Sequence, residues 1–87
     1  MRKDTKFCEL DLATLDGTRM RGRYHAPTTT SSSVRPSDML RDHPGEFLLL
    51  SNVIIREGDQ QRQADTVLVR TDSISFIELP ARGWSTA

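Results

Sequence analysis

Hydrophobic and polar residues alternate along KFCELDLATL, residues 6–15, and this alternation predicts the first structural element. One face carries Cys8, Leu10, Leu12 and Thr14. The other face carries Glu9, Asp11 and Ala13. A period of two residues is typical of a β-strand that is buried on one side. The dipeptide Asp16-Gly17 follows directly, and it predicts a hairpin turn because glycine accepts a positive φ.

The second strand of this hairpin, GTRMRGRYHA at residues 17–26, has a basic residue at every second position. These residues are Arg19, Arg21, Arg23 and His25. The residues between them, Met20, Gly22 and Tyr24, fall on the opposite face. The basic stripe has two interpretations. It binds phosphate groups, since guanidinium suits bidentate contact, or it is the solvated face of a sheet.

The register of the hairpin bears on this choice. A three-residue turn, Asp16 to Thr18, separates apolar from charged positions cleanly, and a buried face fixes register strongly. The pairs are then Leu12 with Gly22, Leu10 with Tyr24, Glu9 with His25, Asp11 with Arg23, and Ala13 with Arg21. We therefore favour a salt-bridged solvent face in which Arg19 and Arg21 lack acidic partners. Gly22 is expected at a sharp bend of the sheet.

The middle of the chain predicts a loop and a short helix. APTTTSSSVRP, residues 26–36, is a run of small hydroxylic residues with nothing to bury, so it predicts a mobile loop. A phosphorylation site there is the less favoured alternative. RPSDMLRDHPGE predicts one or two helical turns, with Ser37 as cap, Met39 and Leu40 as apolar anchor, and Pro44-Gly45 as the end.

Three further strands are predicted after this helix. EFLLLSNVIIRE, residues 46–57, is apolar on both faces, as in a central strand covered on both sides. A helix competes there, but the β-branched end and the following Gly58-Asp59 favour a strand. GDQQRQ predicts a polar turn, and strands follow over Thr66–Thr71 and residues 74–79. The fold class is mainly β: a five-stranded, strongly bent antiparallel sheet or SH3-like small barrel, with one short helix between its second and third strands.

Size and charge narrow the class of protein. The 87 residues predict one domain over 1–87, with its core at about 6–80 and a tail at 81–87. A domain this small buries only about 60% of its unfolded surface, and assembly with further copies adds buried area. Twelve basic and twelve acidic residues give no net charge, which counts against a dedicated nucleic-acid binder. One cysteine and no signal or membrane-spanning run predict a cytoplasmic protein without membrane contact.

Candidate chemistry is sparse. His25 and His43 lack metal partners at ligand spacing, and Cys8 alternates with core leucines, so we expect it buried and inert. Charge pairing explains Glu9 and Asp11 without catalysis. The sequence has no phosphate loop or nucleophile elbow, so we expect no enzyme, no catalytic or metal-binding residue and no cofactor. Trp84 in the tail either anchors a partner or folds over the open end of the sheet.

The two halves of the Sm motif have counterparts in this chain. The first half resembles LDGTRMRG and continues with EFLLLSNVIIRE, and the second half resembles TVLVRTDSISFIEL. Gly17 and Gly22 match the turn and bend glycines, and Arg70-Thr71-Asp72 stands where the family often has Arg-Gly-Asp or Arg-Gly-Asn. The chain thus resembles the Sm-like family, of LSm and Hfq type, over about residues 7–79. The segment RPSDMLRDHPGEFLLL is also similar to small bacterial domains of unknown function, a resemblance that implies no activity.

The departures from the Sm pattern bear on function. An insertion of roughly twenty residues replaces the Asp-x-x-x-Asn segment of RNA-binding members, and Thr71 replaces a glycine, so the resemblance does not imply the family's RNA pocket. It does imply assembly, because Sm-like subunits commonly pair their fourth strand with the fifth strand of a neighbour. The corresponding edge residues are Thr66, Leu68, Arg70, Ile74 and Phe76.

We therefore expect a non-catalytic Sm-like domain that forms homo-oligomers and serves as an adaptor or scaffold for protein partners. The alternative is an RNA-binding ring that uses the basic strand face. Candidate contacts for nucleic acid or a partner are Arg19, Arg21, Arg23, Arg70 and Asp72. For Arg70 and Asp72 two roles stay open: lining a ring pore, or stabilising the turn at a strand break.

Overall fold

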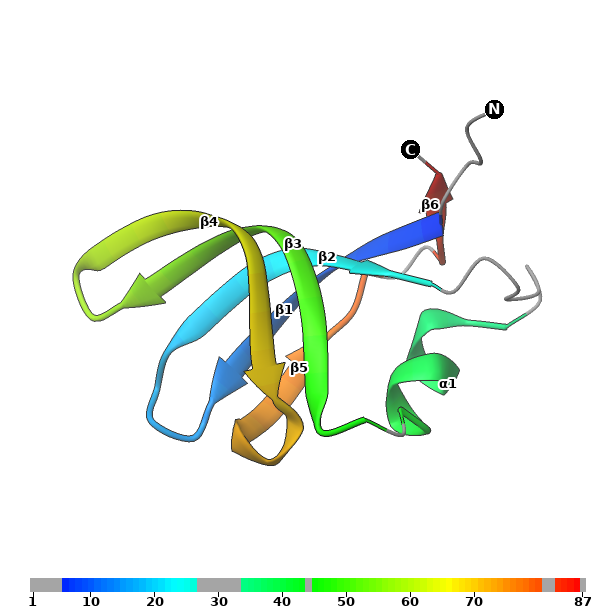
Figure 1. The fold of residues 1–87 in the computed structure, drawn as a ribbon, viewed down its shortest axis with the longest axis horizontal. Helices are drawn as coiled ribbons and strands as arrows, with labels where there is room; N and C mark the ends of the chain where they lie inside the picture. Colours follow the sequence, from blue (N-terminus) through cyan, green and yellow to red (C-terminus); the bar gives the residue numbers. More distant parts are fainter. Residues whose placement is uncertain (1–5, 27–33, 44, 81–82, 87) are drawn as a thin grey trace.

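The computed structural model describes residues 6–26, 34–43, 45–80 and 83–86. They form one antiparallel sheet and one short helix (Figure 1). The elements are β1 (Lys6–Thr14), β2 (Arg19–His25), α1 (Pro36–Arg41), β3 (Phe47–Glu57), β4 (Gln60–Arg70), the 3₁₀ turn η1 (Thr71–Ser73), β5 (Ile74–Glu78) and β6 (Ser85–Thr86). The mainly β fold with a helix between the second and third strands is confirmed. Most of the predicted mobile loop, residues 27–33, lies outside the described residues.

The strands lie in the order β4-β3-β2-β1-β5, and β6 pairs with the beginning of β1. Within the part of the chain described, β4 and β5 are the two ends of this order and do not pair with each other. The sheet is therefore bent but open, not a closed barrel. Figure 1 shows its curvature most plainly along the β3–β4 hairpin.

The β1–β2 hairpin has the predicted faces but not the predicted register. Leu10 lies opposite Gly22, and Asp11 lies opposite Arg21. Each pairing differs by two residues from the predicted one. A shift of two leaves every side chain on its predicted face, because the side-chain period of a strand is two. The apolar and basic faces of the hairpin are therefore as predicted, while the charge pairs across it are not.

The turn of this hairpin explains the shift. It has three residues, as predicted, but they are Leu15–Gly17 and not Asp16–Thr18. The Thr14 N–H donates to the Thr18 carbonyl at 2.9 Å and closes the turn. Gly17 then occupies the last turn position with a φ of 94°, where glycine has no steric penalty.

A bulge divides β3 into two halves. Its buried residues are Leu48, Leu50, Val53 and Ile55. The alternation changes phase at Asn52, whose φ is 51°, and the β2–β3 register shifts between Arg21 and Arg23. The bulge turns the apolar residues of both halves to the same core. The other face is not covered, since Leu49 is 55% exposed, so the prediction of a strand covered on both sides is wrong.

β4 begins earlier than predicted. It pairs with β3 from Gln60 onward, so Gly58-Asp59 alone forms the turn. Gly58 has a φ of 60° at the first central position, as a type II′ hairpin turn requires. The segment 60–63, predicted as part of a polar turn, is exposed strand. The side chains of this segment are exposed and do not contact the core, which suits their polar character.

The helix α1 and the tail cover one end of the core. The N-cap of α1 is Arg35, with Pro36 in the first turn, so the prediction of a Ser37 cap is wrong. Met39 and Leu40 pack against the core as predicted. Trp84 folds back over the sheet: its Nε1 donates to the Val34 carbonyl at 2.6 Å.

One cluster of buried residues from β1 to β4 forms the core. It consists of Cys8, Leu10, Leu12, Tyr24, Leu48, Leu50, Val53, Ile55 and Val69. Gly22 lies against it, where an added Cβ would be 3.1 Å from Val53 Cγ2. This close approach lets β3 cross β2 at the bulge. No helix in the described part of the chain is long and apolar enough to span a membrane.

Candidate functional site

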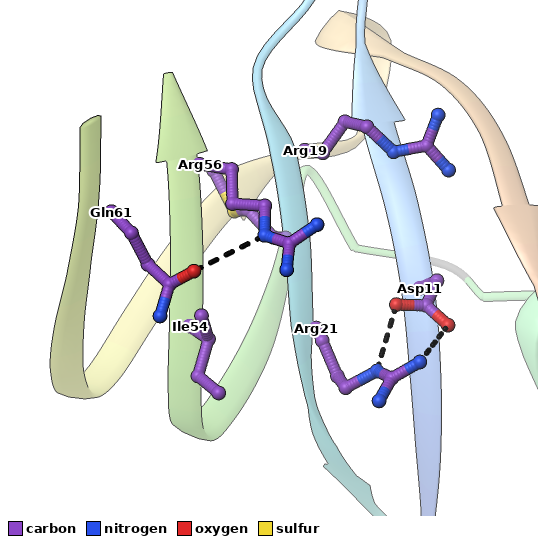
Figure 2. Close-up of a pocket in the computed structure, with 7 residues that line it drawn as sticks. Asp11, Arg19, Arg21, Ile54, Arg56 and Gln61 are labelled. Carbon is purple, nitrogen blue, oxygen red and sulfur yellow. Dashed lines mark hydrogen bonds and ion pairs between the residues drawn. The ribbon is translucent and has the colours of Figure 1, made fainter. Parts of the chain in front are cut away.

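A hollow on the solvent face of the sheet gathers three arginines (Figure 2). Its volume is about 170 Å³. It is lined by Asp11, Arg19, Met20, Arg21, Ile54, Arg56 and Gln61, which come from four adjacent strands. Arg19 and Arg21 were predicted from the basic stripe as candidate contacts. The third arginine, Arg56, comes from β3 and was not predicted.

Arg21 is bound to a carboxylate. Its Nε donates to Asp11 Oδ1 at 3.0 Å, and its Nη2 donates to Asp11 Oδ2 at 3.3 Å. This hydrogen bond, together with the charge of Asp11, raises the pKa of Arg21 above its usual value. The prediction that Arg21 lacks an acidic partner is wrong, because the shifted register places Asp11 directly across the hairpin.

Arg19 has a looser acidic neighbour. Its Nη2 lies 3.8 Å from Glu78 Oε1, within ion-pair range but beyond hydrogen-bonding distance. Its guanidinium also lies over the ring of Phe76, 5.6 Å from the centroid. Both neighbours come from β5, which pairs with β1 on the side away from β2. The hairpin alone could not reveal them, so the prediction that Arg19 has no acidic partner is also wrong.

Arg56 lies directly opposite Arg19 in the β2–β3 ladder. Its Nε donates to Gln61 Oε1 at 3.3 Å, and no carboxylate in the described ranges pairs with it. Figure 2 shows its side chain crossing over β2 toward the other two arginines. The signal in the sequence was weak: Arg56 is the one basic residue of the segment 46–57. Its face depends on the bulge at Asn52.

The rest of the basic stripe has other contacts. The Arg23 guanidinium lies 4.5 Å from the centroid of the Phe7 ring, and Glu9 is its neighbour across the hairpin. His25 Nε2 lies 2.7 Å from Ser51 Oγ. This contact has the form of a base beside a nucleophile, but no described carboxylate bonds to His25 to orient the ring. The third member of a hydrolytic triad is therefore missing.

Arg70 and Asp72 form a pair at the strand break. Arg70 donates to both carboxylate oxygens of Asp72, at 3.2 Å and 3.0 Å. The same turn is held by the Ser73 hydroxyl, which donates to the Arg70 carbonyl at 2.7 Å. Within one chain these residues therefore stabilise the turn between β4 and β5. They do not contribute to the arginine hollow.

Two exposed apolar groups mark the ends of the sheet. Leu68 on β4 is 62% exposed and lies opposite Leu49 on β3. Phe76 on β5 is 43% exposed and lies opposite Ala13 on β1. Leu68 and Phe76 share the solvent face, because their neighbours Val69 and Ile77 pack toward the core. Both predicted edges thus carry a large apolar side chain in contact with water.

The remaining reactive groups have structural surroundings. Burial raises the pKa of Cys8 to about 11, so its thiol stays protonated at neutral pH, as predicted for an inert cysteine. His43 Nε2 lies 2.8 Å from the Phe47 carbonyl. No three His, Cys, Asp or Glu residues of the described ranges gather as metal ligands would.

No protein-family model matches the chain, and no curated protein matches its sequence. The case for a function therefore depends on the geometry of the sheet edges and of the arginine hollow.

Proposed function

We propose that this chain is a non-catalytic, Sm-like domain that assembles with further copies of itself and acts as an adaptor or scaffold. The observation that carries the proposal is the open sheet, whose two ends, β4 and β5, each carry an exposed apolar residue on the same face. A long unpaired edge strand with apolar side chains aggregates unless something covers it. Pairing β4 of one copy with β5 of the next covers both ends with a single type of contact.

The side chains favour one register for this pairing. An antiparallel ladder with Leu68 opposite Phe76 of the next copy joins the two exposed apolar residues. The same ladder places Val67 opposite Ile77, and both of these pack toward the core in one chain. A slip of one residue would instead place the exposed Leu68 opposite the core-facing Ile77, or the exposed Phe76 opposite the core-facing Val67. Because opposite residues of a ladder share a face, such a slip would mismatch the core and solvent faces of the two copies.

Two further features support the Sm-like assignment. The order β4-β3-β2-β1-β5 leaves as free ends the same two strands that the Sm resemblance assigns to assembly. Gly22 lies at the bulge where β2 meets β3, which suits the bend glycine of the motif. In this proposal, neighbouring copies complete the small barrel that one chain leaves open.

Light scattering coupled to gel filtration tests the assembly. We expect the wild-type chain to elute at a multiple of its 9.8 kDa mass at tens of micromolar. Leu68→Lys should shift it toward the monomer, because a lysine at the edge blocks strand addition. Leu15→Lys is the matched control, since Leu15 is 73% exposed but lies in the β1–β2 turn. A monomeric wild-type chain, or equal effects of the two variants, would contradict the proposal.

RNA binding by a ring of such copies is the second candidate, and the observation in its favour is that Arg56 joins Arg19 and Arg21 in one hollow. The geometry supports it less, because Arg21 and Arg70 each donate two hydrogen bonds to a carboxylate. It predicts binding that weakens steeply with salt. If a mixed RNA pool shows no mobility shift at low salt, this candidate is excluded.

A further inference from the structure

We propose that the hollow lined by Arg19, Arg21 and Arg56 is a binding site for a single phosphate group carried by a small ligand. The site consists of residues of one chain, so it does not depend on assembly. Three arginine side chains line this hollow, which has a volume of about 170 Å³ and lies near the centre of the sheet. Guanidinium is the side-chain group best matched to a phosphate, because its donors form a planar fork.

Arg19 lies directly opposite Arg56 in the β2–β3 ladder. Like charges directly across an antiparallel ladder destabilise the sheet, and both side chains line the same hollow. Asp11 neutralises Arg21, and Glu78 approaches Arg19, but no described carboxylate approaches Arg56. The hollow therefore holds the positive charges of three arginines and the negative charge of Asp11, with Glu78 beside it. A bound anion would relieve the remaining repulsion.

Arg19 and Arg56 both have side-chain N–H groups without a hydrogen-bond partner among the described residues. Gln61 accepts a hydrogen bond from Arg56 Nε, which orients the guanidinium and leaves its two Nη groups without a partner among the described residues. The Arg19 side chain makes no hydrogen bond with the described residues, since Glu78 Oε1 is 3.8 Å from its Nη2. The unused N–H groups of these two neighbouring arginines can donate charge-assisted hydrogen bonds to phosphate oxygens.

Carboxylates around the hollow limit the size of the ligand that it can hold. Asp11 and Glu78 lie beside the arginines, and Glu9 lies two residues before Asp11 on the same face of β1. These carboxylates interrupt the basic stripe. A polyanion extended along β2 would pass close to them and be repelled, whereas one phosphate group between Arg19 and Arg56 would not. The geometry therefore favours a small phosphorylated ligand over a nucleic-acid backbone.

The test is a titration of the full chain, followed by the NMR signals of the arginine Nε–Hε groups. Inorganic phosphate and adenosine monophosphate are added separately at constant ionic strength, with chloride as the reference anion. We expect saturable shifts at Arg19 and Arg56 with phosphate and none with chloride. Tighter binding of the monophosphate would identify an ester as the ligand class, and equal binding would identify free phosphate.

Variants give the site two opposite signatures. Arg56→Gln should weaken phosphate binding by about tenfold, since a charge-assisted hydrogen-bond partner is lost. Asp11→Asn should strengthen it several-fold, because it frees Arg21 and removes a repelling charge. Arg41→Gln, which removes an exposed charge on α1, is the control and should change nothing.

Three results would overturn the proposal. The first is a response to phosphate no larger than the response to chloride. The second is unchanged binding in Arg56→Gln. The third is an affinity for single-stranded oligonucleotides that rises with their length and falls steeply with salt, which would replace a single-phosphate site by a nucleic-acid surface. None of these readouts depends on the oligomeric state, so this proposal and the assembly proposal can fail separately.

Discussion

Gly22 has little room for a side chain, because β3 approaches it closely. A Cβ at this position would lie 3.1 Å from Val53 Cγ2, 3.3 Å from Leu50 Cβ and 3.4 Å from the Ser51 carbonyl. All three atoms belong to β3 at its bulge. The sequence identified Gly22 as the bend of the sheet. The structure adds the physical reason, which is close approach of the backbones and not a positive φ.

Gly22→Val should therefore destabilise the fold by about 1–3 kcal/mol, as overpacking of a core does. Urea unfolding followed by circular dichroism measures this free energy. Gly83→Val is the matched control, because a Cβ there meets nothing within 4 Å, and its effect should stay within about 0.5 kcal/mol. Equal effects of the two substitutions would show that the approach at Gly22 does not matter.

Cys8 makes the stability depend on alkaline pH. Burial raises the pKa of its thiol from 9.0 to about 11 in the folded state. Between these values the folded chain keeps a proton that the unfolded chain has lost, so the free energy of unfolding should fall as the pH rises from about 9 to about 11. Cys8→Ala should show a shallower fall in the same window. The pKa of Tyr24 is raised mainly by burial, which acts in both proteins, and to a lesser extent by the charge of Cys8. Cys8→Ala removes the second cause, which makes the fall shallower in the same direction. Parallel curves would contradict this account.

At the scale of elements, the bulge in β3 decides which residues form the core. Asn52 takes a left-handed conformation, which asparagine tolerates better than most residues. A strict alternation would instead have placed Leu48 and Ile55 on opposite faces. The polar Ser51-Asn52 pair inside an apolar run was the visible sign of this bulge in the sequence. Without the bulge, the apolar residues fall on both faces of the strand, and the sequence then predicts a strand covered on both sides.

Asn52→Val should cost about 1–2 kcal/mol of stability, since a β-branched residue resists a φ of 51°. Asn52→Gly should be close to neutral, because glycine adopts this conformation without a steric penalty. Thermal unfolding of the two variants beside the wild type provides the comparison. If valine were tolerated as well as glycine, the bulge would not depend on residue 52.

An indole hydrogen bond holds Trp84 in place, beside the pairing of β6 with β1. Trp84→Phe keeps an aromatic ring beside Tyr24, 6.2 Å away between centroids in the wild type, but removes the donor to the Val34 carbonyl. We expect a loss of about 1 kcal/mol, the usual net value of one hydrogen bond. Urea unfolding followed by far-ultraviolet circular dichroism measures it without relying on tryptophan fluorescence. No change in stability would mean that the indole hydrogen bond adds nothing to the ring contact and the β6–β1 pairing.

The sequence predicted the elements better than their pairing. The faces of β1 and β2 follow from a period of two residues, which a register shift of two does not alter. The charge pairs do depend on register. The predicted turn at Asp16–Thr18 placed Arg21 opposite Ala13, whereas the observed turn at Leu15–Gly17 places it opposite Asp11. The start of β4 was missed because Gln60 to Gln63 pair with β3 through backbone groups and bury nothing.

At the scale of the whole molecule, both candidate surfaces are products of topology. The arginine hollow needs β3 beside β2, and the apolar ends need β4 and β5 to lie farthest apart in the sheet. No local pattern contains either fact. The resemblance to the Sm motif anticipated which strands would be the edges. It did not include Arg56, because it concerns strand order and turn residues and not the exposed face.

The central claim is that β4 of one copy pairs with β5 of another, and cysteine pairing tests it most directly. Leu68→Cys and Phe76→Cys chains of different isotopic mass are mixed, oxidised and analysed by non-reducing mass spectrometry. The raised pKa of the buried Cys8 thiol keeps it from competing. The account predicts that disulfides between positions 68 and 76 predominate over 68–68 and 76–76 pairs. Random pairing, matching a control mixture of Leu68→Cys and Leu15→Cys chains, would contradict it.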